Sequence, residues 1–116
     1  WREIIELTEK ALADLGAYLY SVRYFAEPGD PRRGRDLAAS KVCLGCHSVS
    51  GSGGRTASDL ARVRGLDSPA SVMSALWNHS FIMEHRAERR RVAWPQISPE
   101  EMADLVAFLQ SLGRSR

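Results

Sequence analysis

Cys43-Leu44-Gly45-Cys46-His47 is the stretch from which the rest of the chain can be interpreted. Its C-x-x-C-H spacing is the attachment signature of c-type haem. Each thiol can form one thioether bond to the haem, and the adjacent histidine can give an axial nitrogen to the iron. A redox disulfide would favour a βαβ pattern and a structural zinc four ligands, and the sequence offers neither. We therefore predict one covalently attached haem c, bound by Cys43 and Cys46, with His47 on its iron.

Length and charge narrow the function classes. The 116 residues suit one domain, and 16 basic against 14 acidic residues give no overall field that would attract nucleic acid. Residues 1–22 are the most apolar segment, but charged residues interrupt them, so no segment is expected to span a bilayer. No signal peptide is recognisable. Bacterial haem attachment takes place outside the cytoplasm, so we expect a periplasmic or otherwise extracytoplasmic protein whose signal was removed or lies upstream.

Four segments have the apolar spacing of amphipathic helices. The second and fourth begin with a polar cap followed by proline, at Asp30-Pro31 and Ser98-Pro99, which is typical of helix starts. The third is expected to be capped by Asp67 or Ser68, with Pro69 in its first turn, and to end near Asn78 or His79. No segment alternates with a period of two, so we predict an all-α fold with a Gly/Ser-rich loop at 49–56, and with helices at residues 4–22, 31–40, 68–79 and 98–112.

The first and last of these helices resemble each other. Residues 7–22 align without gaps with residues 97–112, and six of the sixteen positions are identical. Such a repeat suggests a duplicated element. We therefore divide the chain into residues 1–28, an N-terminal helix and linker derived from a preceding haem domain, and residues 29–116, the haem domain. The hypothesis is that the intact protein is, or descends from, a tandem two-haem protein.

Residues 29–113 resemble a class I c-type cytochrome. The resemblance rests on Gly34 and Leu37, the haem motif, Asp59-Leu60, a methionine-bearing loop and the helix 101–109. It implies that the first and last helices of the domain cross with Gly34 against Phe108. Residues 76–95 also resemble a bacterial subset of mono- and di-haem cytochromes. Two positions depart from the family: Ser58 replaces a frequent proline, which leaves open the carbonyl that orients His47, and Ala38 replaces a haem-packing aromatic.

The sixth iron ligand has several candidates. The resemblance implies a methionine between the middle helices and the last one, and Met83 is our choice, in a loop that bends over the haem. His79 is the main rival, while His85 is less favoured because charged residues flank it. Met73 and Met102 lie on apolar helix faces and are read as core residues.

A basic run follows Met83. It is either a solvated helix face or a positive rim near the haem edge that attracts an acidic redox partner; its residues are Arg86, Arg89, Arg90 and Arg91. No nucleic-acid motif accompanies it. The resemblance implies a one-electron carrier and no enzyme. The alternatives are a haem enzyme or sensor with an open sixth site, for peroxide or a gas, and a haem subunit docked in a larger respiratory or photosynthetic complex.

Overall fold

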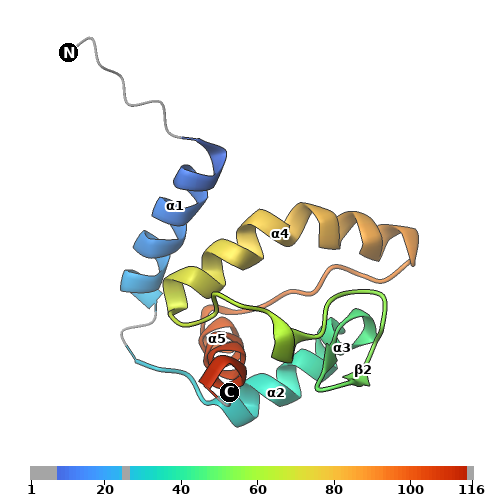
Figure 1. Cartoon of the computed structure of the whole chain (residues 1–116). Helices are drawn as coiled ribbons and strands as arrows, with labels where there is room; N and C mark the ends of the chain where they lie inside the picture. The colour runs from blue at the N-terminus through green and yellow to red at the C-terminus, as the bar shows by residue number, and fades with distance from the viewer. Residues whose placement is uncertain (1–7, 25–26, 115–116) are drawn as a thin grey trace, which may run out of the picture.

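The computed structural model describes residues 8–24 and 27–114, and these residues are mostly helical (Figure 1). The expected all-α fold is confirmed, with one small two-stranded hairpin that the sequence did not predict. In chain order the elements are α1 (Glu9–Tyr24), α2 (Pro31–Ser40), α3 (Cys43–Cys46), β1 (Ser48–Val49), β2 (Ser52–Gly53), η1 (Leu60–Arg62), α4 (Pro69–Arg89) and α5 (Pro99–Arg114).

Helices α2 and α5 cross and make the most extensive helix contact of the described residues. They approach closely at Gly34, where a Cβ atom would lie only 2.7 Å from the Cβ of Phe108. The expected pairing of these two residues is confirmed. Around the crossing, Ala38, Leu105 and Phe108 form a buried cluster. Ala38, which departs from the family pattern, is therefore part of the α2/α5 contact.

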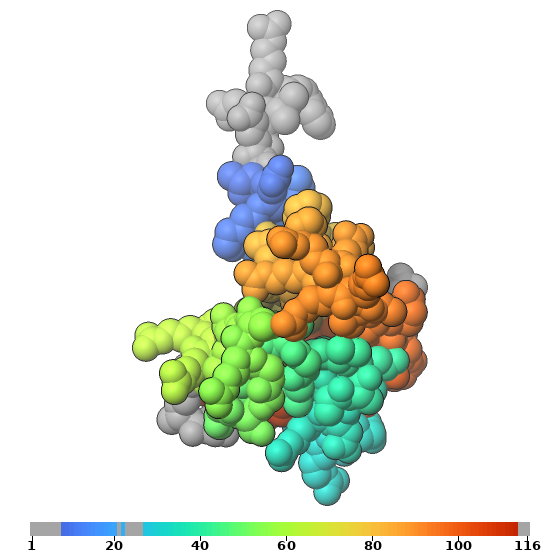
Figure 2. All heavy atoms as spheres, turned by 90° about the vertical axis from the view of Figure 1, so that its right-hand side faces the viewer, coloured from blue at the N-terminus to red at the C-terminus, as the bar shows by residue number. Residues whose placement is uncertain are grey.

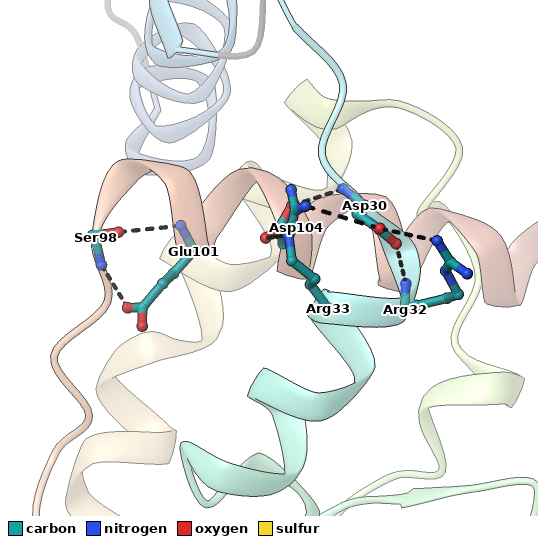
Figure 3. A network of polar contacts seen from close by, with 6 residues as sticks. All are labelled: Asp30, Arg32, Arg33, Ser98, Glu101 and Asp104. Carbon is teal, nitrogen blue, oxygen red and sulfur yellow. Dashed lines mark hydrogen bonds and ion pairs between the residues drawn. The ribbon is translucent and has the colours of Figure 1, made fainter.

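A polar network joins the start of α2 to α5 (Figure 3). The side chain of Asp30 caps α2 by accepting a hydrogen bond from the Arg32 amide, at 2.8 Å. The buried carboxylate of Asp104 accepts bonds from the Asp30 amide at 2.7 Å and from the Arg33 guanidinium at 2.8 and 3.0 Å. The Arg33 hydrogen bonds hold the pKa of Asp104 below its ordinary value. At the start of α5, Ser98 and Glu101 form a reciprocal capping box.

Helix α4 has Pro69 in its first turn as expected, and of the two expected caps, Asp67 and Ser68, it is Ser68 that caps it. Its expected end near Asn78 or His79 is wrong, because the helix continues to Arg89. No glycine or proline interrupts residues 70–90, so nothing in this stretch breaks the helix. The helix stops where Arg91 adopts a left-handed conformation (φ 57°) and the Val92 amide donates to the Ala87 carbonyl. This is a Schellman ending.

Helix α1 packs mainly on α4, with a smaller contact with α5 (Figure 1). The part of the expected helix at residues 4–7 lies outside the described residues. Ala13 and Ala17 are buried, and Ala17 joins a second cluster with Leu66, Val72, Met73 and Val106. Met102 packs against this cluster, so both methionines read as core residues are confirmed in that role. None of the helices formed by residues 8–24 and 27–114 has the length and apolar character to cross a membrane.

Candidate functional site

The two cysteines begin and end the single turn of α3. Both are partly buried, and neither thiol is in a disulfide. Burial raises the pKa of the Cys43 thiol. The turn is entered through Val42, whose φ of 69° is unusual for a β-branched residue and redirects the chain between α2 and α3. Both sulfur atoms thus come from a single short helical turn that follows a sharp change of chain direction at Val42.

His47 follows α3 directly, and its ring is held from one side. Its Nδ1 lies 2.7 Å from the backbone carbonyl oxygen of Ser58. With Nδ1–H donating to that carbonyl, Nε2 is the nitrogen that carries the lone pair a metal needs. Ser58, which replaces the proline frequent in the family, therefore supplies the carbonyl that orients His47. The sequence alone had left this carbonyl open.

Asp59, next to Ser58, ties the surrounding loop together. Its carboxylate accepts hydrogen bonds from the amides of Ser50 at 3.0 Å, Gly51 at 2.7 Å and Ala61 at 2.9 Å. Ser50 and Gly51 form the turn of the hairpin, both with positive φ, and Ala61 lies in η1. The Gly51 amide, followed by the other amides, holds the pKa of Asp59 below its ordinary value. Asp59 thus ties the hairpin turn to η1, the two segments between which Ser58 lies in the chain.

The segment after the hairpin returns to α3. The Gly54 amide donates to the carbonyls of Leu44 and His47, and the amides of Thr56 and Ala57 both donate to the Cys46 carbonyl. These bonds satisfy α3 carbonyls that a four-residue helix leaves free. They also wrap the Gly/Ser-rich loop around the haem-attachment motif.

The C-terminal turns of α4 lie over this region. Figure 2 shows them, in orange, against the teal and green atoms of the segment that includes α3 and the following loop. The Arg86 guanidinium donates to the Thr56 carbonyl at 2.9 Å, and Arg90 Nη1 lies 3.6 Å from Cys46 Sγ. A cavity of about 380 Å³ opens there, lined by Cys46, Thr56, Arg86, Arg89 and Arg90. The basic run therefore borders the cysteine that the motif assigns to haem attachment.

Met83 lies on α4 and not in a loop, so its expected loop position is wrong. Because residues three and seven apart share a helix face, Met83 lies on the same face as Arg86, which contacts Thr56, and Arg90, which contacts Cys46. Met83 is partly buried, whereas His79 and His85 are exposed. Its role as the sixth ligand stays a prediction.

These groups fit a covalently attached haem. Two thiols and one imidazole with a single available nitrogen are the donor set of c-type haem attachment, and Cys46 lines a cavity. Within residues 8–24 and 27–114 there is no cluster of three or more His, Cys, Asp or Glu side chains that would bind a metal ion directly. Sequence reasoning missed the role of Asp59, although an aspartate before Leu60-Ala61-Arg62 is a helix-cap pattern.

Comparison with known proteins gives one match. The family model described as Cytochrome c matches residues 31–113, from the start of α2 almost to the end of α5. No curated protein and no solved structure matches the chain significantly.

Proposed function

Because the chain belongs to the cytochrome c family, we propose that it carries one electron at a time through a single haem c attached to Cys43 and Cys46, with His47 and Met83 as axial ligands. Haem-based electron transfer is the general activity of the family. The observation that carries the proposal is the bond between His47 Nδ1 and the Ser58 carbonyl, which leaves Nε2 for iron directly after the two thiols.

Each side chain has a defined part. The bound haem supplies an iron that alternates between the ferrous and ferric states. Cys43 and Cys46 fix the haem to α3, and the loop bonds to the α3 carbonyls keep that turn rigid. His47 is oriented by the Ser58 carbonyl, and the neighbouring Asp59 carboxylate ties the hairpin turn to η1. A thioether ligand from Met83 favours ferrous iron and raises the reduction potential relative to a second histidine.

The arginines beside Cys46 form the proposed partner surface, defined as Arg86, Arg89 and Arg90. All three are exposed, and they surround the side chain that would carry a thioether bond. A positive surface at this edge attracts acidic partners and speeds encounter in a salt-dependent way. We therefore propose an acidic redox protein as donor or acceptor, and an extracytoplasmic location, which is typical of the family.

The partner surface is tested with small oxidants of opposite charge. Arg89→Glu should slow oxidation of the reduced protein by anionic ferricyanide and speed oxidation by a cationic cobalt complex, with both effects shrinking at high salt. Arg32→Glu, at the end of α2 remote from α3, is the charge-matched control. If both variants change both rates equally, only net charge matters and the local surface plays no part.

The axial ligands are tested by absorption spectra of the oxidised and reduced holoprotein, with and without carbon monoxide. We expect a low-spin spectrum with the weak long-wavelength sulfur-to-iron band and no reaction with carbon monoxide. Met83→Ala should lose the band and bind carbon monoxide, while His79→Ala should keep the wild-type spectrum. A low-spin wild type without the band, unchanged by Met83→Ala, would identify another ligand, and His79 would be the next residue to substitute.

A haem enzyme or sensor is the second candidate. The observation that favours it is the position of Met83 on a regular helix, where the backbone has less freedom to bring sulfur to the iron than in a loop. A displaceable sixth ligand would admit a gas or peroxide. Rapid binding of carbon monoxide by the wild-type reduced protein would support this function over simple electron transfer.

A further inference from the structure

Helix α1 has an apolar side that its own domain does not cover. Four aliphatic residues define this outer face: Leu12, Leu15, Leu19 and Val22. They are exposed to 54%, 48%, 60% and 61%. The helix contacts α4 through the opposite side, where Ala13 and Ala17 are buried. A contiguous stripe of four large aliphatic side chains is typical of an interaction surface.

The sequence repeat between α1 and α5 shows how the corresponding residues pack in α5. In the alignment of residues 7–22 with 97–112, the four outer-face residues correspond to Met102, Leu105, Leu109 and Leu112 of α5. In α5 Leu105 is buried, Leu109 and Leu112 pack against the cluster that contains it, and Met102 packs against the cluster that contains Val72 and Val106. Leu105 lies in the cluster formed with α2, against which Cys43 and Leu44 of the haem-attachment segment also pack. Leu105, Leu109 and Leu112 thus take part in the contact with α2, whereas the corresponding residues of α1, Leu15, Leu19 and Val22, are exposed.

A glycine on α1 gives a second, independent indication. Gly16 is a poor residue for mid-helix, yet a Cβ atom at this position would meet no atom within 4 Å. At Gly34, by contrast, a neighbouring helix requires the glycine. The residue of α5 that corresponds to Gly16 is Val106, which is 2% exposed and packed in the core. Nothing among the described residues accounts for Gly16, whereas close approach of another element would.

We propose that the outer face of α1 packs against a helix of the α2 type from a second cytochrome c domain, which precedes residue 1 in the complete polypeptide. Helix α1 then serves two domains. It is the last helix of the preceding domain, through Leu12, Leu15, Leu19 and Val22, and it supports the present domain through Ala13 and Ala17. The protein would carry a second covalently attached haem in the same polypeptide. This inference goes beyond the proposed function, which concerns the haem at Cys43 and Cys46.

The first test counts haems in the complete reading frame, expressed with haem-attachment machinery. Intact mass and the pyridine haemochrome absorbance should give at least two haems per polypeptide, and a single haem would overturn the proposal. Hydrogen exchange then compares α1 in the complete polypeptide and in residues 1–116. We expect slower exchange in the complete polypeptide, and equal exchange would also overturn the proposal. Neither readout depends on the sixth ligand, so failure here is distinguishable from failure of the proposed function.

Variants locate the contact on α1. In the complete polypeptide, Gly16→Leu should lower the midpoint of thermal unfolding, whereas the same substitution in residues 1–116 should leave it unchanged or raise it. Glu9→Leu, at an exposed position outside the outer face, is the control and should lower neither midpoint. A midpoint unchanged by Gly16→Leu in the complete polypeptide would contradict close packing at this position.

A second copy of residues 1–116 is the competing occupant of the outer face. Sedimentation velocity of the wild-type holoprotein should show a monomer. A dimer that Leu15→Glu converts to a monomer would assign the outer face to self-association and overturn the proposal.

Discussion

Gly34→Ala is the substitution whose effect the structure defines most sharply. A Cβ atom at residue 34 would lie 2.7 Å from the Cβ of Phe108 and closer still to the backbone carbonyl of Asp104. Optimal separations between carbon atoms are about 3.5–4.0 Å. Because the nearest obstacle is the backbone of α5 and not the end of a flexible side chain, one added methyl group must push the two helices apart.

The expected loss of stability follows from two opposing terms. Overpacking a well-packed contact costs about 1–3 kcal/mol, and the backbone obstacle places Gly34→Ala near the upper value. Alanine recovers about 1 kcal/mol in helix propensity relative to glycine. The balance is a loss of about 2 kcal/mol in the free energy of unfolding, which lowers the unfolding midpoint of a domain of this size by about 8 °C.

Thermal unfolding of the holoprotein, followed by far-ultraviolet circular dichroism, measures this difference. Gly16→Ala on α1 is the matched control, because a Cβ atom there meets nothing within 4 Å. In residues 1–116 the control should gain about 1 kcal/mol from helix propensity alone. The two alanine substitutions should therefore shift the midpoint in opposite directions. A Gly34→Ala variant as stable as the wild type would refute the close crossing of α2 and α5.

Two further predictions concern aspartates. Asp104→Asn should cost about 1.5 kcal/mol at pH 7, at the low end for a charged hydrogen bond because Arg33 is largely exposed. The folded protein depresses the Asp104 pKa, so the stability that Asp104 contributes is present at neutral pH and is lost as the pH falls below about 4. The free energy of unfolding of the variant, measured with denaturant, should therefore fall less than that of the wild type on acidification. Parallel curves of unfolding free energy against pH for the two proteins would contradict this. Asp59→Asn should loosen the Ser58 carbonyl, make His47 a less basic ligand and raise the reduction potential in a redox titration. Asp36→Asn, at an exposed position on α2, is the control because it removes the same charge. An equal shift of the reduction potential in both variants would mean that only the lost charge matters and that Asp59 does not act through His47.

The features that the sequence predicted correctly are local ones. Asp30-Pro31 and Ser98-Pro99 begin helices because the cap and the proline act within the first turn. The C-x-x-C-H motif, which indicates the family, is equally local because its five residues are contiguous, and its role in haem attachment stays a prediction. The pairing of Gly34 with Phe108 is the exception, because it is a correctly predicted contact between residues far apart in the sequence. It came from family resemblance, because nothing in the spacing of two residues that far apart indicates their contact.

The features that the sequence did not predict depend on distant partners or on the absence of a stop signal. Arg33 and Asp104 are separated by 71 positions, and His47 and the Ser58 carbonyl meet only because the hairpin returns the chain. The end of α4 was misplaced for another reason. Asn78 and Ser80 are weak helix formers, but their side chains hydrogen bond to the carbonyls of Ser74 and Trp77 and the helix passes through them.

The continuous α4 places both candidate sixth ligands, His79 and Met83, on one helix. Val72 is fully buried and fixes the rotation of α4 about its axis. His79 and Met83 follow it by seven and eleven residues, close to two and three full turns, so both lie on the same helix face as Val72. The helix face therefore does not distinguish the two candidate ligands, but their position along the helix axis does. Arg90, beside Cys46 Sγ, lies about 10 Å beyond Met83 but about 16 Å beyond His79 at the rise of an α-helix. Along the helix axis Met83 is therefore the candidate nearer to Cys46. Its place on α4, although not the expected loop, thus favours Met83 over His79 as the sixth ligand.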